Sequence, residues 1–183
     1  MSAFSHYIDV MLREGGIAHD LHARLLLAAH FRIAAGDKLA VAWPDWRDHQ
    51  PGEFGLLCRV FGVPDALASY GELIAPLGHA QLVRTFPVQA VPDTPSQISF
   101  VRNRRQDKFS PSAAARLTRR AEARGETWKG PSRCPPDPEI AHFLSIPSTS
   151  AQRTFRLYVS RVTGSQEARG GEAYGLGMVI PNF

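Results

Sequence analysis

Cysteine and long apolar runs are scarce in this chain, and each shortage excludes a class of protein. The 183 residues include two cysteines, Cys58 and Cys134, which are too few and too far apart for a zinc site or a disulfide framework. No apolar run approaches the roughly 18 residues of a membrane span. The N-terminal segment MSAFSHYIDV lacks the basic start and apolar middle of a signal peptide. These shortages predict a protein of a reducing, cytoplasmic compartment with no membrane partner.

The motifs of several common enzyme classes are also missing. The sequence holds no P-loop, no GxGxxG dinucleotide-binding motif and no GxSxG nucleophile elbow. Its histidines, cysteines and carboxylates nowhere have the spacing of metal ligands. We therefore expect neither a metal site nor a cofactor.

The chain has instead a hydrophobic fraction of 44%, which can supply a packed core, and one strongly basic segment. Residues 102–133 carry ten basic and three acidic side chains, a net charge of +7, which leaves −3 for the rest of a chain whose total is +4. A basic stripe on a mildly acidic body is typical of proteins that bind polyanions. A solvated helix face is the other interpretation, but such faces usually mix glutamate with lysine. The arginine-rich, acid-poor composition therefore favours a nucleic-acid partner.

Hydrophobic periodicity in the first half of the chain predicts the order β-α-β-β-α-β. The expected strands are 6–13, 38–43, 55–61 and 81–91, and the expected helices are 20–35 and 65–77. Gly36 and Gly78 are expected to end the two helices. This is the ferredoxin-like, split βαβ arrangement, and it places the chain in the α+β class. Many RNA-binding modules use this arrangement, but so do unrelated enzymes, so the order alone does not fix the function.

A proline-rich joint at residues 91–96 predicts a domain boundary. We expect a ferredoxin-like domain at 1–94 and an RNA-binding C-terminal domain at 95–183. Short strands are expected in the second domain at 143–146, 154–162 and 173–180.

The basic segment is expected to contain a helix at about 110–125. Ser110 and Pro111 are residue types of a helix N-cap and first turn, and Gly125 suits a helix end. Four arginines then share one helix face: Arg116, Arg119, Arg120 and Arg124. Arginine-rich helices of this kind lie along phosphates or enter RNA grooves, where arginine makes bidentate contacts.

Cleavage of RNA without a metal needs a general base that removes the proton of the attacking 2′-hydroxyl. Histidine suits this role because its pKa lies near neutrality, and a hydroxyl donor or a cation can assist. His30 lies late in the first expected helix, beside its apolar face, where a lone histidine is more often a core residue than a catalyst. The candidate hydroxyls are in the C-terminal third: Ser148, Thr149, Ser150 and Tyr174. An ordinary turn and a core tyrosine would explain them equally well, so chemistry alone does not choose.

Five segments occur here in the order that they have in a known family: HYIDVMLR, LLAAHFRIAAGDKLAVAWPD, SPSAAARLTRRAEARG, STSAQRTFRLYV and YGLGMVIPNF. Together they span almost the whole chain, which resembles the type I-F CRISPR endoribonucleases. The resemblance implies a ferredoxin-like domain followed by a domain with an arginine-rich helix, in agreement with the order above. It also implies a metal-independent enzyme that binds the CRISPR repeat hairpin and cleaves pre-crRNA at the 3′ base of the stem. Attack by a 2′-hydroxyl would leave a 2′,3′-cyclic phosphate. The crRNA product would be retained in the interference (Cascade) complex, whose other subunits are the expected partners.

The resemblance also assigns roles to residues. The catalytic histidine and serine fall on His30 and Ser148, and the tyrosine that helps to place the histidine falls on Tyr174. The positions expected to bind RNA are Arg102, Arg104, Arg116, Arg119, Arg120, Ser150 and Phe155. Phe155 would stack under the terminal base pair of the hairpin, and the three helix arginines would line the groove. Arg102 and Arg104 take base-reading positions.

Arg104 departs from the family pattern, which usually has glutamine there. Because glutamine suits adenine and arginine suits guanine, this departure favours a different base pair.

Two other functions stay open on the sequence. One is a non-catalytic, RNA-hairpin-binding subunit of a ribonucleoprotein complex, and the other is a generic ferredoxin-like RNA-binding protein unrelated to CRISPR. Incubation with hairpin RNA in EDTA separates them: cleavage supports the enzyme, tight binding without cleavage supports the subunit, and weak, unselective binding supports the generic module.

Overall fold

A computed structural model describes residues 4–48, 50, 52–93, 96–103, 111–128, 142–148, 154–164 and 172–183 of the chain. The strands are β1 His6–Leu12, β2 Ala40–Ala42, β3 Leu57–Gly62, β4 Val83–Thr85, β5 Gln89–Ala90, β6 Gln97–Arg102, β7 Phe143–Pro147, β8 Thr154–Thr163 and β9 Ile180–Pro181. The helices are α1 Ala18–Ala34, α2 Pro64–His79 and α3 Pro111–Glu122, with a 3-10 helix, η2, at Glu172–Tyr174. Within the described ranges, none of these helices combines the length and apolar character that a bilayer crossing requires.

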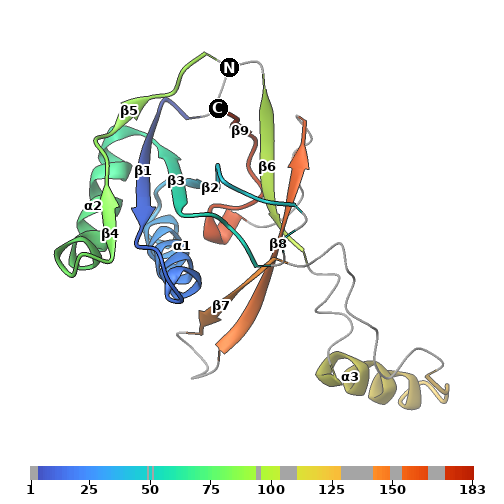
Figure 1. Cartoon of the computed structure of the whole chain (residues 1–183). Coiled ribbons are helices and arrows are strands. Elements are labelled where there is room, and N and C mark those ends of the chain that lie inside the picture. The colour runs from blue at the N-terminus through green and yellow to red at the C-terminus, as the bar shows by residue number, and fades with distance from the viewer. Residues whose placement is uncertain are drawn as a thin grey trace.

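The first sheet has the strand order β2-β3-β1-β4, and β5 pairs with β1 beside β4. Strand β3 is antiparallel to both β1 and β2 and lies between them, so the two strands that flank α1 are not neighbours. Helices α1 and α2 pack on one face of this sheet (Figure 1). The predicted α+β class and ferredoxin-like βαββαβ order are therefore confirmed.

The alternation of residues in β1 explains how this sheet is held. Ile8, Val10 and Leu12 are almost completely buried and face the helices. Burial of one such side chain stabilises the fold by roughly 1.5–3 kcal/mol. On the opposite face, Asp9 pairs in register with Arg59 of β3, and the guanidinium donates to both carboxylate oxygens at 2.7 and 2.9 Å. The carboxylate on this face of β1 is thus held in a two-bond ion pair with Arg59.

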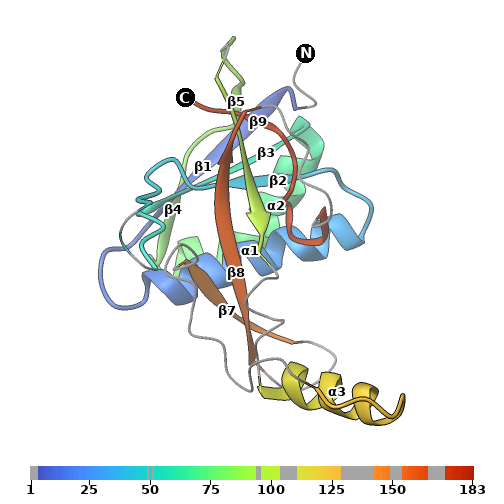
Figure 2. The ribbon, with the colours of Figure 1, turned by 90° about the vertical axis from the view of Figure 1, so that its right-hand side faces the viewer.

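The second sheet has the order β7-β8-β6-β9, and all its pairings are antiparallel. Its strand β7 packs against helix α1, and in the view of Figure 2 the long strand β8 runs in front of that helix. The two sheets meet at an aromatic cluster in which Trp43, after β2, contacts Phe54 at 4.9 Å and Phe100 of β6 at 5.1 Å between ring centroids. His142, just before β7, stacks on Trp46 at 3.8 Å. This cluster positions the β7–β8 hairpin beside α1.

A buried histidine ties α1 to the same cluster. Trp43 Nε1 donates to His22 Nδ1 at 3.1 Å, and His22 Nε2 donates to the carbonyl oxygen of Gly55 at 2.9 Å. With one nitrogen accepting and the other donating, the imidazole is neutral. Burial lowers the pKa of His22 to about 4, although the hydrogen bond to Gly55 opposes this shift.

One expected strand is wrong. The segment 173–180 was expected to be extended, but it continues from η2 into a turn, and only Ile180–Pro181 form strand β9. Gly175 and Gly177 have φ of +71° and +86°, in the left-handed region that a strand excludes. These glycines reverse the chain next to Tyr174.

Two further expectations need correction, and one strand was missed. The expected strand 81–91 is broken into β4 and β5 around Pro87, which has no amide hydrogen to donate, and it begins late because Gln81 has φ of +56°. Helix α2 runs through Gly78 and ends at His79. Strand β6 was not expected, because its consecutive residues Ile98, Ser99 and Phe100 are all buried and show no polar–apolar alternation.

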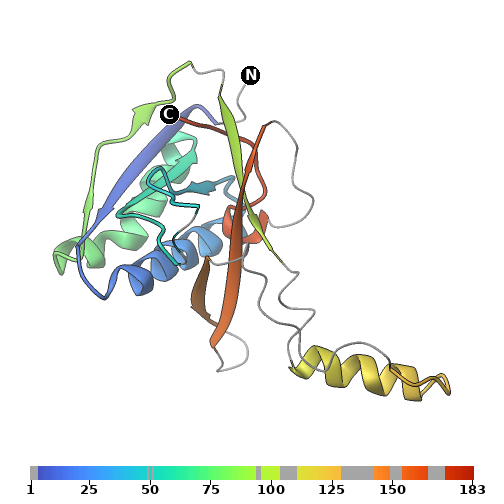
Figure 3. The ribbon, with the colours of Figure 1, turned by 45° about the vertical axis from the view of Figure 1, so that its right-hand side comes forward.

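The expected arginine-rich helix at 110–125 is present as α3, Pro111–Glu122. Figure 3 shows that α3 lies apart from both sheets. Arg116, Arg119 and Arg120 are exposed, whereas Ala121 is buried. Arg124, beyond the helix end, pairs with Glu126 at 3.0 Å. The structure therefore presents Arg116, Arg119 and Arg120 to solvent on one side of the helix.

Candidate active site

His30 lies in the second half of α1 and is half-buried. Its Nδ1 donates a hydrogen bond to the backbone carbonyl oxygen of Ala173 in η2. A carbonyl oxygen can only accept, so this contact places the proton of the neutral imidazole on Nδ1. Nε2 is then left with a lone pair, which is the state that a general base requires.

Tyr174 stacks on the same imidazole. The two ring centroids are 4.4 Å apart, and the ring planes are inclined by 21°. Burial raises the pKa of the Tyr174 phenol, and the positive charge of Arg102 partly opposes the increase. The phenol is therefore neutral at physiological pH and remains a hydrogen-bond donor.

Gly175 fixes the turn that presents Tyr174. Its carbonyl oxygen accepts a hydrogen bond from the amide of Val41 in β2 at 2.8 Å. A Cβ at this position would lie 3.0 Å from Val41 Cγ2 and 3.2 Å from the carbonyl oxygen of Leu39. The absence of a side chain thus lets η2 approach β2 closely, and α1, β2 and η2 together hold the His30–Tyr174 pair.

Phe155 and Arg102 extend this group of side chains. The ring of Phe155, in β8, is 6.5 Å from the ring of Tyr174, with an edge-on geometry. The guanidinium carbon of Arg102, in β6, lies 5.8 Å from the centroid of Phe155. His30, Tyr174, Phe155 and Arg102 therefore form a continuous series of contacts that combines a base, a phenol, an aromatic ring and a cation.

Ser148 directly follows β7, at the end of the hairpin that also carries Phe155. Ile146 pairs with Phe155 and Pro147 with Thr154, so Ser148 lies one residue beyond the last paired position. It is half-buried. The structure thus places the expected serine and the expected stacking aromatic at the same end of one hairpin.

The three expected arginines of α3 are not part of this group. Arg116, Arg119 and Arg120 lie on α3, apart from the two sheets. Arg104 and Ser150 lie outside the described residues. Among the residues that the structure describes, no three histidine, cysteine, aspartate or glutamate side chains gather as a metal-ligand group.

Sequence reasoning missed the hydrogen-bond partner of His30. The Ala173 carbonyl sets the tautomer, but a backbone carbonyl leaves no mark in a pattern of side chains. The segment that contains Ala173 was also expected to be a strand, so the turn that brings its carbonyl to His30 was not foreseen.

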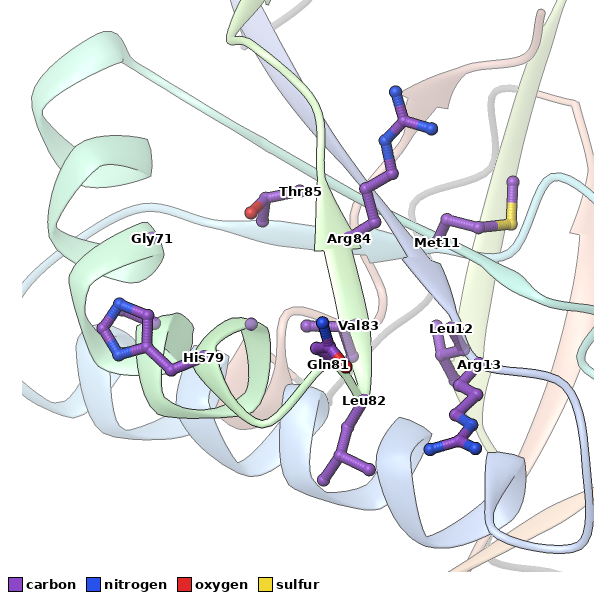
Figure 4. Close-up of a pocket in the computed structure, with 12 residues that line it drawn as sticks. Met11, Leu12, Arg13, Gly71, His79, Gln81, Leu82, Val83, Arg84 and Thr85 are labelled. Carbon is purple, nitrogen blue, oxygen red and sulfur yellow. The ribbon is translucent and has the colours of Figure 1, made fainter.

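A pocket of about 670 Å³ lies elsewhere, between β1, β4 and the end of α2. Its basic side chains do not converge: in Figure 4, Arg84 and Arg13 extend in opposite directions, and His79 projects on the far side of β4. This pocket therefore lacks the geometry of a single anion site.

No curated protein sequence matches this chain. Solved structures show only weak similarity, and two of them serve as examples. A CRISPR-associated protein from Thermus thermophilus is 16% identical, with 96% of this chain and 98% of that chain covered and a TM-score of 0.35. The CRISPR endoribonuclease Cse3 bound to 19 nt RNA is 17% identical, with 97% of this chain and 98% of that chain covered and a TM-score of 0.31.

A match to a family model also covers almost the whole chain. Residues 8–183 match the family described as CRISPR-associated protein (Cas_Csy4). The match begins inside β1 and includes every element that carries the His30 group. The chain belongs to the Cas_Csy4 family, the type I-F crRNA endoribonucleases of CRISPR systems.

Proposed function

We propose that this protein binds the CRISPR repeat hairpin and cleaves pre-crRNA at the 3′ base of the stem without a metal ion. Family membership supports crRNA processing as the general activity. The single observation that carries the mechanism is the state of His30, whose Nδ1 donates to the Ala173 carbonyl and whose Nε2 is left as a base. The imidazole is fixed further by the stacked ring of Tyr174.

In the proposed reaction, His30 Nε2 removes the proton of the 2′-hydroxyl next to the scissile phosphate. The 2′-oxygen attacks phosphorus, the bond from phosphorus to the 5′-oxygen breaks, and the leaving oxygen takes up a proton. The products are a 2′,3′-cyclic phosphate and a 5′-hydroxyl. A positioned base of this kind typically accelerates a reaction by about 10²–10⁴-fold.

Ser148 and Tyr174 are proposed to position the 2′-hydroxyl and His30. Tyr174 suits this role because its phenol stays protonated and its ring already stacks on the imidazole. Phe155 is proposed to stack under the terminal base pair. Arg102, whose guanidinium lies above Phe155, is proposed to read a base at the foot of the stem.

Arg116, Arg119 and Arg120 of α3 are proposed to contact the phosphates of the stem. Their exposure on one side of the helix supports this role. Arg104 and Ser150 keep their proposed roles in RNA binding. After cleavage, the protein is proposed to retain the crRNA within the interference complex and to contact its other subunits.

A division into two domains, 1–94 and 95–183, remains part of the proposal. The strands of the first sheet all precede Val91, and those of the second sheet all follow Ser96, which supports a boundary between them.

Cleavage of a labelled repeat hairpin in EDTA tests the proposal. We expect the wild-type protein to cut once at the 3′ base of the stem, and the 3′ end of the hairpin product to be a cyclic phosphate. His30→Ala should abolish cutting while its hairpin affinity stays within a few-fold. An RNA with a 2′-deoxy substitution at the cut site should bind and stay intact.

Loss of cleavage in EDTA that magnesium restores would refute the metal-independent mechanism. Tight hairpin binding by a wild-type protein that never cleaves would instead identify a non-catalytic subunit.

A further inference from the structure

The outer face of the β7–β8 hairpin carries a cluster of aromatic and basic side chains that the proposed mechanism does not use. Phe143 pairs with Tyr158, and Ser145 pairs with Arg156, so these side chains share one face. The alternate residues of the hairpin, which include Leu144, are buried against the core. Phe143 and Tyr158 are half-exposed, and Arg156 is exposed. We call Phe143, Arg156, Tyr158 and the adjacent His19 of α1 the outer platform.

The side chains of the outer platform are stacked on one another. The ring centroids of Phe143 and Tyr158 are 5.7 Å apart, and the guanidinium carbon of Arg156 lies 4.8 Å from the centroid of Phe143. The imidazole of His19 meets the other side of the cluster, with its centroid 5.5 Å from that of Phe143 and an edge-on geometry. Two aromatic rings and a planar cation therefore form one surface.

His19 explains why this face is not an open sheet edge. Strand β7 is the outermost strand of its sheet, and the amide of Ser145 donates to His19 Nε2 at 3.3 Å. Burial lowers the pKa of His19, and the nearby Asp20 opposes this shift. Asp20 is itself paired with Arg24 at 2.7 Å. His19 thus occupies the amide of Ser145 at the sheet edge, which disfavours pairing of a strand from another chain at this edge.

The chemistry of the platform fits single-stranded nucleic acid. Bases stack on aromatic rings and on arginine planes, whatever their sequence, and arginine also attracts the phosphate. Within the described ranges, Arg156 forms no ion pair, and Asp20, the acid beside the platform, already has a partner. The surface is therefore aromatic and positive, whereas a protein-binding face would more commonly combine aromatic residues with a rim of both charges.

The platform lies on the same hairpin as Ser148 and Phe155. From Phe143 to Ser148 the extended chain covers on the order of 15 Å, a length that a few nucleotides can span. Phe155 faces the opposite side of β8, where the stem would end. We infer that the outer platform binds the unpaired RNA segment on the 3′ side of the scissile phosphate.

This inference rests on the proposed function, because it needs a hairpin seated with its 3′ base at His30. We assign the 3′ segment to the platform because it is joined directly to the phosphate that His30 and Ser148 are proposed to act on. One consequence is that the uncut RNA binds more tightly than the cut hairpin, because cleavage releases the segment that the platform holds.

Binding of three non-cleavable RNAs tests the inference. Each carries a 2′-deoxy substitution at the cut site, and they are the hairpin alone, the hairpin with a short 3′ extension, and the hairpin with an equal 5′ extension. Wild-type protein should bind the 3′-extended RNA more tightly than the hairpin alone, by roughly tenfold for one well-stacked base. A 2-aminopurine in the 3′ extension should be quenched on binding, which reports stacking directly.

Two variants locate the effect. Tyr158→Ala and Arg156→Ala should each remove most of the gain from the 3′ extension and leave binding of the hairpin alone unchanged. Arg84→Ala is the matched control, because its guanidinium also lies over an aromatic ring, that of Phe86, at 4.9 Å, but on the first sheet. It should keep the full gain. Thermal unfolding of each variant shows whether the fold is retained.

The inference is overturned if the wild-type protein gains nothing from the 3′ extension or if only the 5′ extension helps. It is also overturned if 2-aminopurine is not quenched, a measurement that needs no variant and so does not depend on how well the variants fold. Equal gains in the wild type and both platform variants would assign the extension to another surface, and a protein contact would then be the remaining use of the platform. If the wild type fails to bind the hairpin alone, the proposed function itself is wrong.

Discussion

The imidazole of His30 and the phenol ring of Tyr174 lie nearly parallel, with centroids 4.4 Å apart, although the two residues are 144 positions apart in the sequence. Helix α1 supplies one ring, and the turn at η2 supplies the other. The same turn supplies the Ala173 carbonyl that holds the proton on Nδ1. The orientation and the tautomer of the proposed base therefore depend on one short segment near the C-terminus.

Substitution of Tyr174 should separate the effect of the ring from that of the hydroxyl. Tyr174→Phe keeps the stack and should slow the chemical step by up to about tenfold, as expected for the loss of one hydrogen bond. Tyr174→Ala loses the stack as well and should slow it on the order of 100-fold, because the imidazole is no longer held. Single-turnover cleavage gives the rates, and hairpin titration should show smaller losses in affinity. Equal losses in rate and affinity would indicate a structural role instead.

Gly175→Ala should reduce both stability and cleavage. The new Cβ would meet Val41 Cγ2 at 3.0 Å in a backbone conformation with φ of +71°, so the turn that carries Tyr174 must shift. Gly36→Ala is the matched control, since Gly36 has φ of +106° but no atom within 4 Å of the added Cβ. Both variants should lose about 1–2 kcal/mol of unfolding free energy through backbone strain. Only Gly175→Ala should also slow cleavage, and similar cleavage rates in the two variants would contradict the positioning role of this turn.

Acid should weaken the junction between the two sheets through His22. The pKa of His22 is about 4 in the folded protein, whereas an unfolded histidine titrates near 6.5, so between these values the unfolded state binds more protons. Stability must therefore fall as the pH decreases, by about 2 kcal/mol from this residue between pH 7 and pH 5. Denaturant unfolding at the two pH values measures the loss.

His22→Gln keeps a donor and an acceptor without a titrating group, so it should be less sensitive to acid than the wild type. Some dependence should remain, because burial also lowers the pKa of His142 and of His19. A variant with the full wild-type pH dependence would show that another group is responsible.

The elements that the sequence predicted best are those whose burial is one-sided. In β1, polar and apolar residues alternate because one face packs on helices, so the strand is visible in the pattern. In β6, Ser99 has no exposed surface and lies between Ile98 and Phe100, so no alternation marks the strand.

The site itself was only partly predictable. His30 could be singled out by its helix position and by resemblance to a family, but its partner is a backbone carbonyl in a turn formed around Gly175. Whether a glycine continues a strand or reverses the chain is decided by the space available against β2, which is a tertiary property. The outer platform depends in the same way on the register between β7 and β8.

Helix α3 provides the last prediction, which concerns how affinity depends on salt. Arg116, Arg119 and Arg120 are exposed on one side of a helix that lies apart from the sheets. Each phosphate contact displaces condensed counterions, so hairpin affinity should fall steeply with salt. Replacement of all three by alanine should weaken hairpin binding strongly and flatten the salt slope by roughly one unit per lost contact. Titrations at several salt concentrations measure both quantities.

A triple variant of Arg24, Arg47 and Arg84 to alanine is the control, because it removes the same charge from exposed positions on α1, on the loop between β2 and β3, and on β4. Long-range attraction between protein and RNA depends on total charge, so both triple variants should lose similar amounts of this attraction. Only the α3 variant should also lose direct contacts with phosphates. The α3 variant should therefore have the flatter slope. Equal slopes would mean that the helix acts only through net charge, and docking on the stem would have to be abandoned.

Arg102→Ala should differ from both triple variants, because a base contact at the stem foot changes the preference for one base pair and leaves the salt slope nearly intact.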